Sequence, residues 1–426
     1  MSDQITRRQF LKKAGATAAA AAVVGPMFLP QGAIGANDRI VMGIIGCGGM
    51  GSADLQYFRA NPEVEFAAVC DVDHNRLEEA VDKAGGKATP YSDFRKLLER
   101  KDIDAVIVAT PDHWHALPTI LACETGKDVY VEKPLATSIG EGRAMVNAAR
   151  RYGRVVQTGT QQRSGAHFQR AVELVRSGHI GKVTLCRAWN VDNELPDGIG
   201  NPPDCSPPPE LDYDMWLGPA PERPYNPNRS HYHFRFFWDY AGGKITDWGT
   251  HLIDILHWGM GVDAPLAVSA SGGKYVIPDN RETPDTMEAV FDCPGFTLVY
   301  SYRGANGYPM DGHDYGMQFH GTKGTLFIDR SGFKVTPDED QCEAISSGGS
   351  PQNEPNVRNF LDCVKSRARP TCDVEITHRS TTASHLGNIA LLTGRKIHWD
   401  RDNERIINDE DANRLLCKPY RAPWHL

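Results

Sequence analysis

The sequence predicts an α/β protein in two parts: an N-terminal doubly wound parallel sheet and a C-terminal α+β domain with an open, largely antiparallel sheet. Between about residues 39 and 157, short apolar runs alternate with amphipathic stretches, a pattern typical of parallel strands covered on both faces by helices. Beyond residue 159, strand-like runs follow one another and the helices are set apart. The 426 residues are enough for about two such domains.

The apolar and amphipathic runs define the elements expected in the first domain, residues 37–160. Strands are expected at Ile40–Ile45, Phe66–Cys70, Ala105–Ala109, Asp128–Val131 and Val155–Thr158. Helices are expected at Ser52–Ala60, His74–Lys83, Asp93–Arg100, Ala116–Thr125 and Ile139–Tyr152. In a sheet of this kind, the ligand binds at the carboxyl ends of the strands.

The second domain, residues 161–426, has a different pattern. A helix at Phe168–Ser177 leads to an alternating run at 181–189 that suits a half-buried strand. A long insert rich in Pro, Gly and Asp then occupies residues 193–229, and loops of this length are more often functional than idle. The remaining strands are expected at Ala267–Gly272, Thr286–Cys293, Phe296–Arg303, Tyr315–His320 and Gly324–Asp329, and closing helices at Asn356–Ser366 and Thr377–Leu392.

The first 36 residues are expected to be a twin-arginine export signal. The segment Thr6-Arg7-Arg8-Gln9-Phe10-Leu11-Lys12-Lys13 precedes a weakly apolar run, and small residues near Ala33 and Ala36 suit cleavage. The apolar run is short for a bilayer span and is interrupted by Gly25, Pro26 and Pro30, and no later segment qualifies as a span. We therefore expect an exported, periplasmic protein without a membrane span after removal of the signal, or a tethered one if cleavage fails.

Charge and cysteine content exclude several classes of protein. A net charge of −8 argues against a nucleic-acid partner. The ten cysteines include no C-x-x-C pair, which argues against a structural zinc site or a redox motif. Cys47, Cys70 and Cys123 are expected to be small buried residues, whereas Cys363 and Cys372 are the nearest candidates for a single disulfide in an exported protein.

A glycine-rich turn directly follows the first predicted strand. Its order is strand, tight turn, helix, with the spacing G-x-G-x-x-G, and its residues are Gly46, Gly48, Gly49, Met50 and Gly51. The free N–H groups at the start of the helix suit a pyrophosphate. The next apolar run ends in Asp71, where a carboxylate accepts hydrogen bonds from a ribose 2′-hydroxyl and repels a 2′-phosphate. The pattern predicts an NAD site and favours NAD over NADP, the alternative being a glycine-rich turn with an incidental aspartate.

Two later strands end in polar segments that should face the nicotinamide side of this site. The first contains Thr110, Pro111 and His115, and the second begins with Glu132 and Lys133. Within the first segment, His113 and Trp114 are candidates to cap the nicotinamide, although an incidental loop position explains His113 equally well. Gln161, Gln162 and Arg163 follow the last strand and could reach the cofactor or the substrate.

Four elements together resemble the Gfo/Idh/MocA oxidoreductases, the family of glucose–fructose oxidoreductase and inositol dehydrogenase. They are the glycine loop, T-P-x-x-x-H at 110–115, T-G-K-x-V-x-x-E-K-P-L at 125–135 and D-x-x-x-H at 247–251. The signal and the segment at 216–220 resemble the exported bacterial branch, and the resemblance covers nearly all of the mature chain. It implies a carbohydrate substrate, redox chemistry without a metal, and a homo-oligomer, either a dimer or a tetramer.

The resemblance implies catalytic roles for Lys133, Asp247 and His251. A lysine at the E-K-P position stabilises the alkoxide that develops as hydride departs, and Pro134 is expected to orient it through a cis bond. Asp247 and His251 are four positions apart on a predicted helix, so the aspartate should raise the basicity of the imidazole, a general base for the hydroxyl proton. Without the resemblance, a helix-start aspartate and a buried histidine would be the better interpretation. A metal site that adds Asp254 is conceivable, but the family chemistry disfavours it.

The segment at 230–238 mixes aromatic and polar side chains, as carbohydrate-binding walls do. Tyr232, His233 and Arg235 are its candidate substrate-binding residues, together with Arg163, although core packing explains the phenylalanines equally well. His231 and His233 lack the further ligands that a zinc site needs.

Three functions are compatible with the sequence. The leading hypothesis is an NAD-dependent oxidoreductase that acts on a sugar, a sugar derivative or a glycoside. Free nicotinamide cofactor is scarce outside the cytoplasm, so an exported enzyme would keep its NAD and reset it during turnover. The same argument admits an NAD-dependent glycosidase that works by oxidation, elimination, hydration and re-reduction. A non-catalytic sensor of NAD and sugar is the third hypothesis, and the presence of the lysine and the Asp–His pair argues against it.

Overall fold

A six-stranded parallel sheet forms the first half of the molecule, with the strand order β3-β2-β1-β4-β5-β6. The computed structural model describes residues 39–426, so the predicted export signal, residues 1–36, lies outside the described residues. The strands are β1 Ile40–Ile45, β2 Val64–Cys70, β3 Thr89–Tyr91, β4 Ala105–Val108, β5 Asp128–Val131 and β6 Val156–Thr158. This confirms the doubly wound sheet. Strand β3 is not among the predicted strands, because three residues that include a proline show no strand periodicity.

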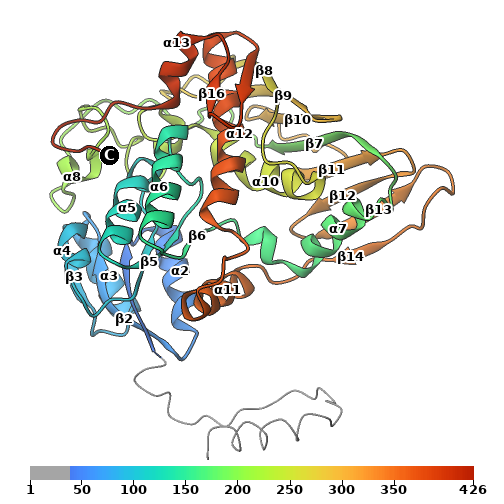
Figure 1. The fold of residues 1–426 in the computed structure, drawn as a ribbon. Coiled ribbons are helices and arrows are strands. Elements are labelled where there is room, and N and C mark those ends of the chain that lie inside the picture. The colour runs from blue at the N-terminus through green and yellow to red at the C-terminus, as the bar shows by residue number, and fades with distance from the viewer. Residues whose placement is uncertain (1–38) are drawn as a thin grey trace, which may run out of the picture. The chain divides into compact units, whose positions relative to one another are not determined.

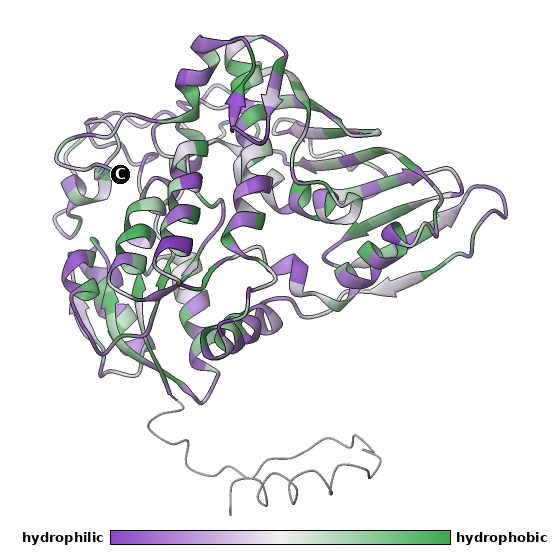
Figure 2. Ribbon diagram, viewed as in Figure 1, coloured by the Kyte–Doolittle hydropathy of each residue, from purple (hydrophilic) through white to green (hydrophobic). Residues whose placement is uncertain are grey.

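Helices cover this sheet on both faces (Figure 1). They are α2 Gly49–Arg59, α3 His74–Lys83, α4 Phe94–Leu98, α5 Ala116–Glu124 and α6 Ile139–Arg151. Every residue of β4 and β5 is buried, which explains why these strands are continuously apolar rather than alternating. In Figure 2, α6 carries both green and purple residues, as expected for a helix with one buried and one exposed face. Helix α5 is largely apolar and mostly buried.

A helix from the end of the chain completes this layer. In Figure 1, α11, Asn353–Ser366, lies beside α2, and its Phe360 ring packs 5.7 Å from Phe58 and 5.8 Å from Tyr130. The core of the first sheet therefore includes residues that are about 200 positions away from it in sequence.

A second sheet of ten strands has the order β14-β13-β12-β11-β7-β10-β9-β8-β15-β16. Its neighbouring strands are antiparallel except for β7 and β10, which confirms a largely antiparallel sheet. The strands are β7 Val183–Val191, β8 Ala267–Gly273, β9 Thr286–Cys293, β10 Phe296–Arg303, β11 Tyr315–Gly321, β12 Gly324–Asp329, β13 Gly332–Pro337, β14 Ser346–Gly348, β15 Ile397–Asp400 and β16 Arg405–Ile406.

Three long helices pack against this sheet: α7 Ala166–Arg176, α10 Gly249–Met260 and α12 Val374–Thr393. In β9, buried Met287, Ala289 and Phe291 alternate with exposed Glu288 and Val290, as expected for a strand with one covered face. The remaining short helices are α8 Tyr213–Leu217 in the long insert, α9 Lys244–Asp247 and α13 Glu410–Asn413.

Two expectations about the second half need correction. The continuous helix expected through Asp247 and His251 is divided, because α9 ends at Asp247 and α10 begins at Gly249. Cys363 and Cys372 are both free thiols and buried, so the disulfide between them is not formed. Cys47, Cys70 and Cys123 are buried, as expected.

Within residues 39–426, no helix combines the length and the apolar character that crossing a bilayer requires.

Candidate active site

The glycine turn after β1 is shaped by close backbone packing. Gly46 has φ +88°, and a Cβ built on it would lie 2.6 Å from the backbone nitrogen of Thr110. A Cβ on Gly51 would lie 2.0 Å from the carbonyl oxygen of Gly46, so the third glycine lets α2 approach the strand. A Cβ on Gly49, by contrast, would meet nothing within 4 Å. The turn is therefore compressed on the protein side and open on the other.

This open side fits the pyrophosphate of a dinucleotide. Helix α2 begins without a side-chain cap, so its first N–H groups are available to an anion. The hydroxyl of Thr110, at the end of the neighbouring strand, is buried without a hydrogen-bond partner in the described structure. Both features match what the glycine spacing predicts.

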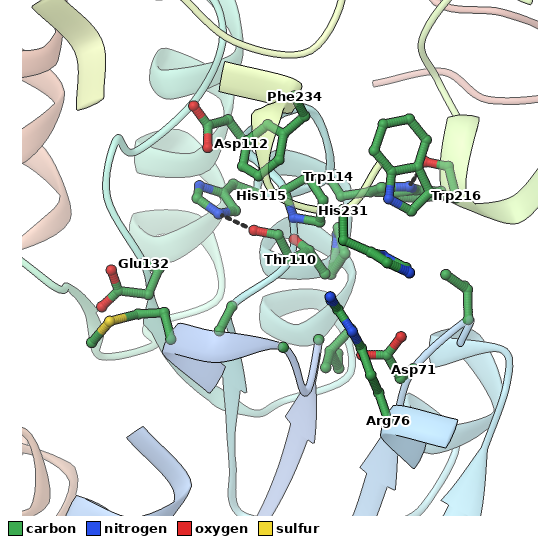
Figure 3. A pocket seen from close by; sticks show the side chains of 18 of the residues that line it. Asp71, Arg76, Thr110, Asp112, Trp114, His115, Glu132, Trp216, His231 and Phe234 are labelled. Carbon is green, nitrogen blue, oxygen red and sulfur yellow. Dashed lines mark hydrogen bonds between the residues drawn. The ribbon is translucent and has the colours of Figure 1, made fainter. Parts of the chain in front are cut away.

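Asp71 lies at the end of β2, where a ribose would be bound. Its Oδ2 accepts a hydrogen bond from the Cys47 backbone nitrogen at 2.7 Å, and its Oδ1 accepts one from the Asp73 backbone nitrogen at 2.9 Å. Burial raises the pKa of Asp71 above its ordinary value. Figure 3 shows Arg76 beside it, with the guanidinium pointing into the cavity. Arg76 is not among the predicted site residues, because a helical arginine five positions after the aspartate has no distinctive local pattern.

A cavity of about 470 Å³ joins these groups to the ends of β4 and β5 (Figure 3). Its lining includes the predicted residues Gly46, Gly48, Gly49, Met50, Asp71, Thr110, Pro111, Trp114, His115, Glu132, Lys133, Tyr232, Arg235 and Asp247. A volume of this size is typical of sites for small molecules and cofactors. The predicted residues come from four strand ends and from the second domain, so tertiary folding brings them to one cavity.

Lys133 and Asp247 meet in the wall of this cavity. Lys133 Nζ donates to Asp247 Oδ1 at 2.7 Å, and it lies 3.3 Å from the Asp247 carbonyl oxygen. Arg235 Nη1 is 3.4 Å from Asp247 Oδ2. Although burial opposes ionisation, Lys133 and Arg235 hold the pKa of Asp247 well below its ordinary range, so the carboxylate remains charged. The Lys133–Pro134 peptide bond is cis, as expected.

The relation between Asp247 and His251 differs from the expectation. Asp247 makes no hydrogen bond to the imidazole; both of its oxygens point to cations, and His251 Nδ1 is buried without a partner in the described structure. Burial, followed by the charges of Lys133 and Arg330, holds the pKa of His251 well below its ordinary value, and Asp247 opposes this only in part. The predicted rise in imidazole basicity is therefore wrong, and the ring is neutral at neutral pH.

Two further carboxyl groups line the cavity. Burial raises the pKa of Asp112 to about 7 and that of Glu132 to about 7, although Lys133 opposes both shifts. The Asp112 carboxylate accepts no hydrogen bond from residues 39–426, and Figure 3 shows it near Phe234 at the cavity. Asp112 is not among the predicted site residues, although its position inside the T-P-x-x-x-H element could have indicated it.

The three aromatic residues of that element have separate environments. His115 bridges two strand ends, with Nδ1 2.7 Å from the Pro134 carbonyl oxygen and Nε2 2.9 Å from that of Thr110. Burial lowers the pKa of His115 to about 4. Trp114 lines the cavity and donates from Nε1 to the Trp216 carbonyl oxygen at 3.0 Å. His113 contacts the same carbonyl at 2.8 Å and is outside the lining, so it does not cap the nicotinamide.

Other candidates lie elsewhere. Arg163 forms a buried ion pair with Asp254, with distances of 2.6 Å and 2.9 Å to the two carboxylate oxygens, and so is not at the predicted substrate site. This pairing also consumes the carboxylate of the alternative metal site, and no group of three or more His, Cys, Asp or Glu residues within residues 39–426 could hold a metal ion. Gln161, His233 and the predicted catalytic His251 are not part of the cavity lining, although His251 lies on the helix that begins two residues after the lining residue Asp247. The neighbouring Gln162 has a buried amide without partners, a feature invisible in the sequence.

The long insert contacts the first domain next to the part of the cavity that contains Asp71. The His74 backbone nitrogen donates to the Glu210 carbonyl at 2.9 Å, and the Asp212 backbone nitrogen donates to Val72 at 2.9 Å. His231 Nε2 donates to Asp73 Oδ2 at 2.9 Å, and the insert residues Met215 and Trp216 line the cavity. Segment 210–231, called the strap below, is therefore bonded to the first domain directly beside Asp71.

Comparison with protein families gives two matches that together span most of the chain. Residues 40–160 match a family model described as "Oxidoreductase family, NAD-binding Rossmann fold". Residues 182–426 match one described as "Oxidoreductase family, C-terminal alpha/beta domain", and both belong to the Gfo/Idh/MocA group. These matches identify an NAD-binding domain followed by the C-terminal domain that is specific to this group.

Two individual relatives align with only part of this chain and share about a third of the aligned residues. The chain is 34% identical over 169 residues to an inositol 2-dehydrogenase from Rubrobacter xylanophilus, covering 39% of this chain and 48% of that protein. It is 31% identical over 204 residues to a glycosyl hydrolase family 109 protein from Shewanella pealeana, covering 42% of this chain and 44% of that protein. The alignments thus span about half the length of these relatives or less.

A solved structure of levoglucosan dehydrogenase in complex with NADH and levoglucosan has the same fold, with a TM-score of 0.67 and 18% identity, covering 84% of this chain and 99% of that one.

Proposed function

The chain belongs to the Gfo/Idh/MocA oxidoreductase family, and from this premise we propose that it transfers a hydride between NAD and a hydroxyl carbon of a sugar, sugar derivative or glycoside. The observation that carries the proposal is the contact between Lys133 and the ionised Asp247 in the wall of the cavity that also contains the glycine turn and Asp71. An ammonium held there can stabilise negative charge on a substrate oxygen. The inositol and levoglucosan dehydrogenases among the similar proteins support a carbohydrate substrate.

Each of the three residues has a defined role in this proposal. Bound NAD supplies the hydride acceptor. Lys133 donates to the substrate oxygen as negative charge develops on it, and Asp247 orients the ammonium by accepting a hydrogen bond from it. His251 is neutral, so it can accept the hydroxyl proton, and its buried Nδ1 has no competing partner in the described structure. Asp247 therefore acts on Lys133 rather than on the imidazole.

We also propose that the cofactor is tightly held. The strap is bonded to the backbone at Val72 and His74 and to the side chain of Asp73, so release of the adenosine requires these contacts to open. Slow release of NAD is consistent with the proposed role of residues 1–36 as a twin-arginine export signal and with a periplasmic location of the protein. A homo-oligomer, dimer or tetramer, is part of the same proposal by analogy with the family.

A redox-neutral glycosidase is the second candidate. It is favoured by the family 109 relative and by two carboxyl groups whose pKa values differ widely, since Asp247 stays ionised whereas Asp112 carries a proton up to a pH of about 7. A proton-bearing acid beside an ionised carboxylate suits departure of a leaving group. Elimination after oxidation would release the aglycone, and addition of water and re-reduction would restore NAD.

The test uses the protein as purified. Mass spectrometry and absorbance should detect bound NAD, and a panel of sugars and glycosides should then be screened for turnover. A keto sugar with reduced cofactor supports the dehydrogenase, whereas released aglycone with no net reduction supports the glycosidase. Cofactor binding without turnover on any sugar, unchanged in Lys133→Ala, would instead support the sensor.

A further inference from the structure

Arg330 is a partly buried arginine without an ionic partner beside the proposed catalytic residues. It lies in the turn between β12 and β13, and its guanidinium makes no hydrogen bond and no ion pair with any part of the chain that the structure describes. Its Nε is buried. Burial lowers the pKa of Arg330, while Tyr315, Glu132 and Asp247 oppose the shift only in part. A buried charge that is incompletely compensated is costly unless a ligand completes its environment.

Arg330, Trp248 and Tyr315 do not line the cavity of about 470 Å³ themselves, but they lie next to its wall residue Asp247. The Arg330 guanidinium carbon is 5.1 Å from the centre of the Trp248 ring, and Trp248 directly follows Asp247 in the chain. The Trp248 ring is 4.9 Å from Tyr315 and 6.4 Å from His251. The positive charge of Arg330 also acts to lower the pKa values of Glu132 and His251. Arg330 is thus an electrostatic neighbour of the reacting groups.

The aromatic neighbours have the character of a carbohydrate-binding surface. Trp248 and Tyr315 are both partly exposed, although most large aromatic residues nearby, such as Tyr300, are buried. Aromatic rings offer apolar surface to the C–H groups of a sugar, and a guanidinium offers paired N–H donors that match a carboxylate or sulfate. Arg235, the other arginine near Asp247, is already directed at that carboxylate, so it is less able to bind an anion.

We propose that Arg330, Trp248 and Tyr315 form a subsite for an anionic substituent, a carboxylate or a sulfate ester, on the carbohydrate substrate. This inference rests on the proposed function, because it specifies the substrate class of the same site. The anionic substituent of the substrate would serve as the counter-ion of the unpaired guanidinium. The neutral sugar of the same configuration leaves Arg330 unpaired and binds more weakly.

The experiment measures binding to the holoprotein by isothermal titration calorimetry. The probes are matched pairs of neutral and anionic sugars: glucose with glucuronate and glucose 6-sulfate, galactose with galacturonate, and mannose with mannuronate. At least one anionic sugar should bind about 10- to 100-fold more tightly than its neutral partner. Arg330→Gln should abolish this preference and leave the affinity for the neutral sugar unchanged within about twofold, and Arg330→Lys should retain part of it. Arg369→Gln, at a solvent-exposed arginine, is the matched control.

Comparison of the carboxylate-bearing sugars with glucose 6-sulfate identifies which anion the subsite prefers. Equal binding of both members in every pair would overturn the proposal, as would a preference that survives Arg330→Gln. Sodium sulfate that binds as tightly as the anionic sugars would also overturn it, because the subsite would then recognise a free ion. Turnover on the same panel is a separate readout. An anionic sugar that wild type and Arg330→Gln oxidise equally well refutes the subsite alone, whereas Arg330-dependent binding without hydride transfer on any sugar refutes the proposed function alone.

Discussion

Replacement of Lys133 by alanine should abolish most of the chemistry and preserve the fold. The wild-type ammonium makes a 2.7 Å charge-assisted hydrogen bond to Asp247 and is the cation proposed to meet the substrate oxygen. Loss of one group that stabilises an oxyanion costs about 3–4 kcal/mol, which corresponds to a kcat that is about 100- to 1,000-fold lower. The expected loss of folding stability is smaller, about 1–2 kcal/mol, because Arg235 remains 3.4 Å from the Asp247 carboxylate and compensates its charge.

The assay is single-turnover reduction of bound NAD, measured by absorbance at saturating sugar, beside a denaturant unfolding curve of the same sample. Lys396→Ala is the matched control, since Lys396 pairs with Asp292 at 2.5 Å on the surface, outside the cavity. It should leave kcat unchanged. Lys133→Arg, which retains the charge, should keep more activity than Lys133→Ala. A decrease in kcat of less than about fivefold in folded, NAD-loaded Lys133→Ala would refute the role assigned to this lysine.

Three further predictions test the turn, the cavity and the strap. Gly51→Ala should lower the free energy of unfolding by about 1–3 kcal/mol and reduce the content of bound NAD, because a Cβ there lies 2.0 Å from a carbonyl oxygen, whereas Gly49→Ala should leave folding stability unchanged in the same denaturant titration. The pKa of Asp112 is raised from 3.8 to about 7 on folding, so its contribution to stability is fully present below about pH 4 and is lost as the pH rises to about 7. The stability of wild type relative to Asp112→Asn, measured by chemical unfolding at several pH values, should therefore fall over this range, and a constant difference would contradict the assignment. His231→Ala removes a side-chain bond of the strap and should speed NAD release about 3- to 10-fold in a displacement assay. An equal acceleration in His74→Ala, whose ion pair with Glu78 is exposed, would show that the strap does not control release.

Most helices and strands of the first domain could be predicted from the sequence, because hydrophobic periodicity and turn residues depend on short stretches of chain. The glycines of the turn are required by backbone contacts within one strand–turn–helix unit, such as the 2.0 Å approach at Gly51. Convergence of Asp71, Thr110 and Lys133 was predictable too, since parallel strands bring their carboxyl ends to one edge of a sheet. Both sheets were predicted, although the three-residue strand β3 was not.

The predictions that were wrong concern the hydrogen-bond and ion-pair partners of individual side chains. The four-residue spacing of Asp247 and His251 predicted a pair, but Lys133, which lies 114 positions earlier, offers a charged donor to the aspartate, and a charge-assisted bond is stronger than one to a neutral imidazole. Arg163 was assigned to the substrate because it follows a strand, whereas the structure pairs it with Asp254, 91 positions later. Spacing along the chain predicts which neighbouring residues can contact each other. It does not predict whether a residue from a distant part of the chain offers a stronger hydrogen bond or ion pair.

The sequence by itself determined the nucleotide-binding half, the cofactor and the lysine at its strand end, because hydrophobic periodicity, turn geometry and strand direction act over short stretches of chain. Only the tertiary structure decided the protonation states of Asp112, Asp247 and His251, the bonding of the strap to the first domain and the isolation of Arg330. These properties depend on desolvation and on long-range electrostatics, and both are set by residues that folding alone brings together.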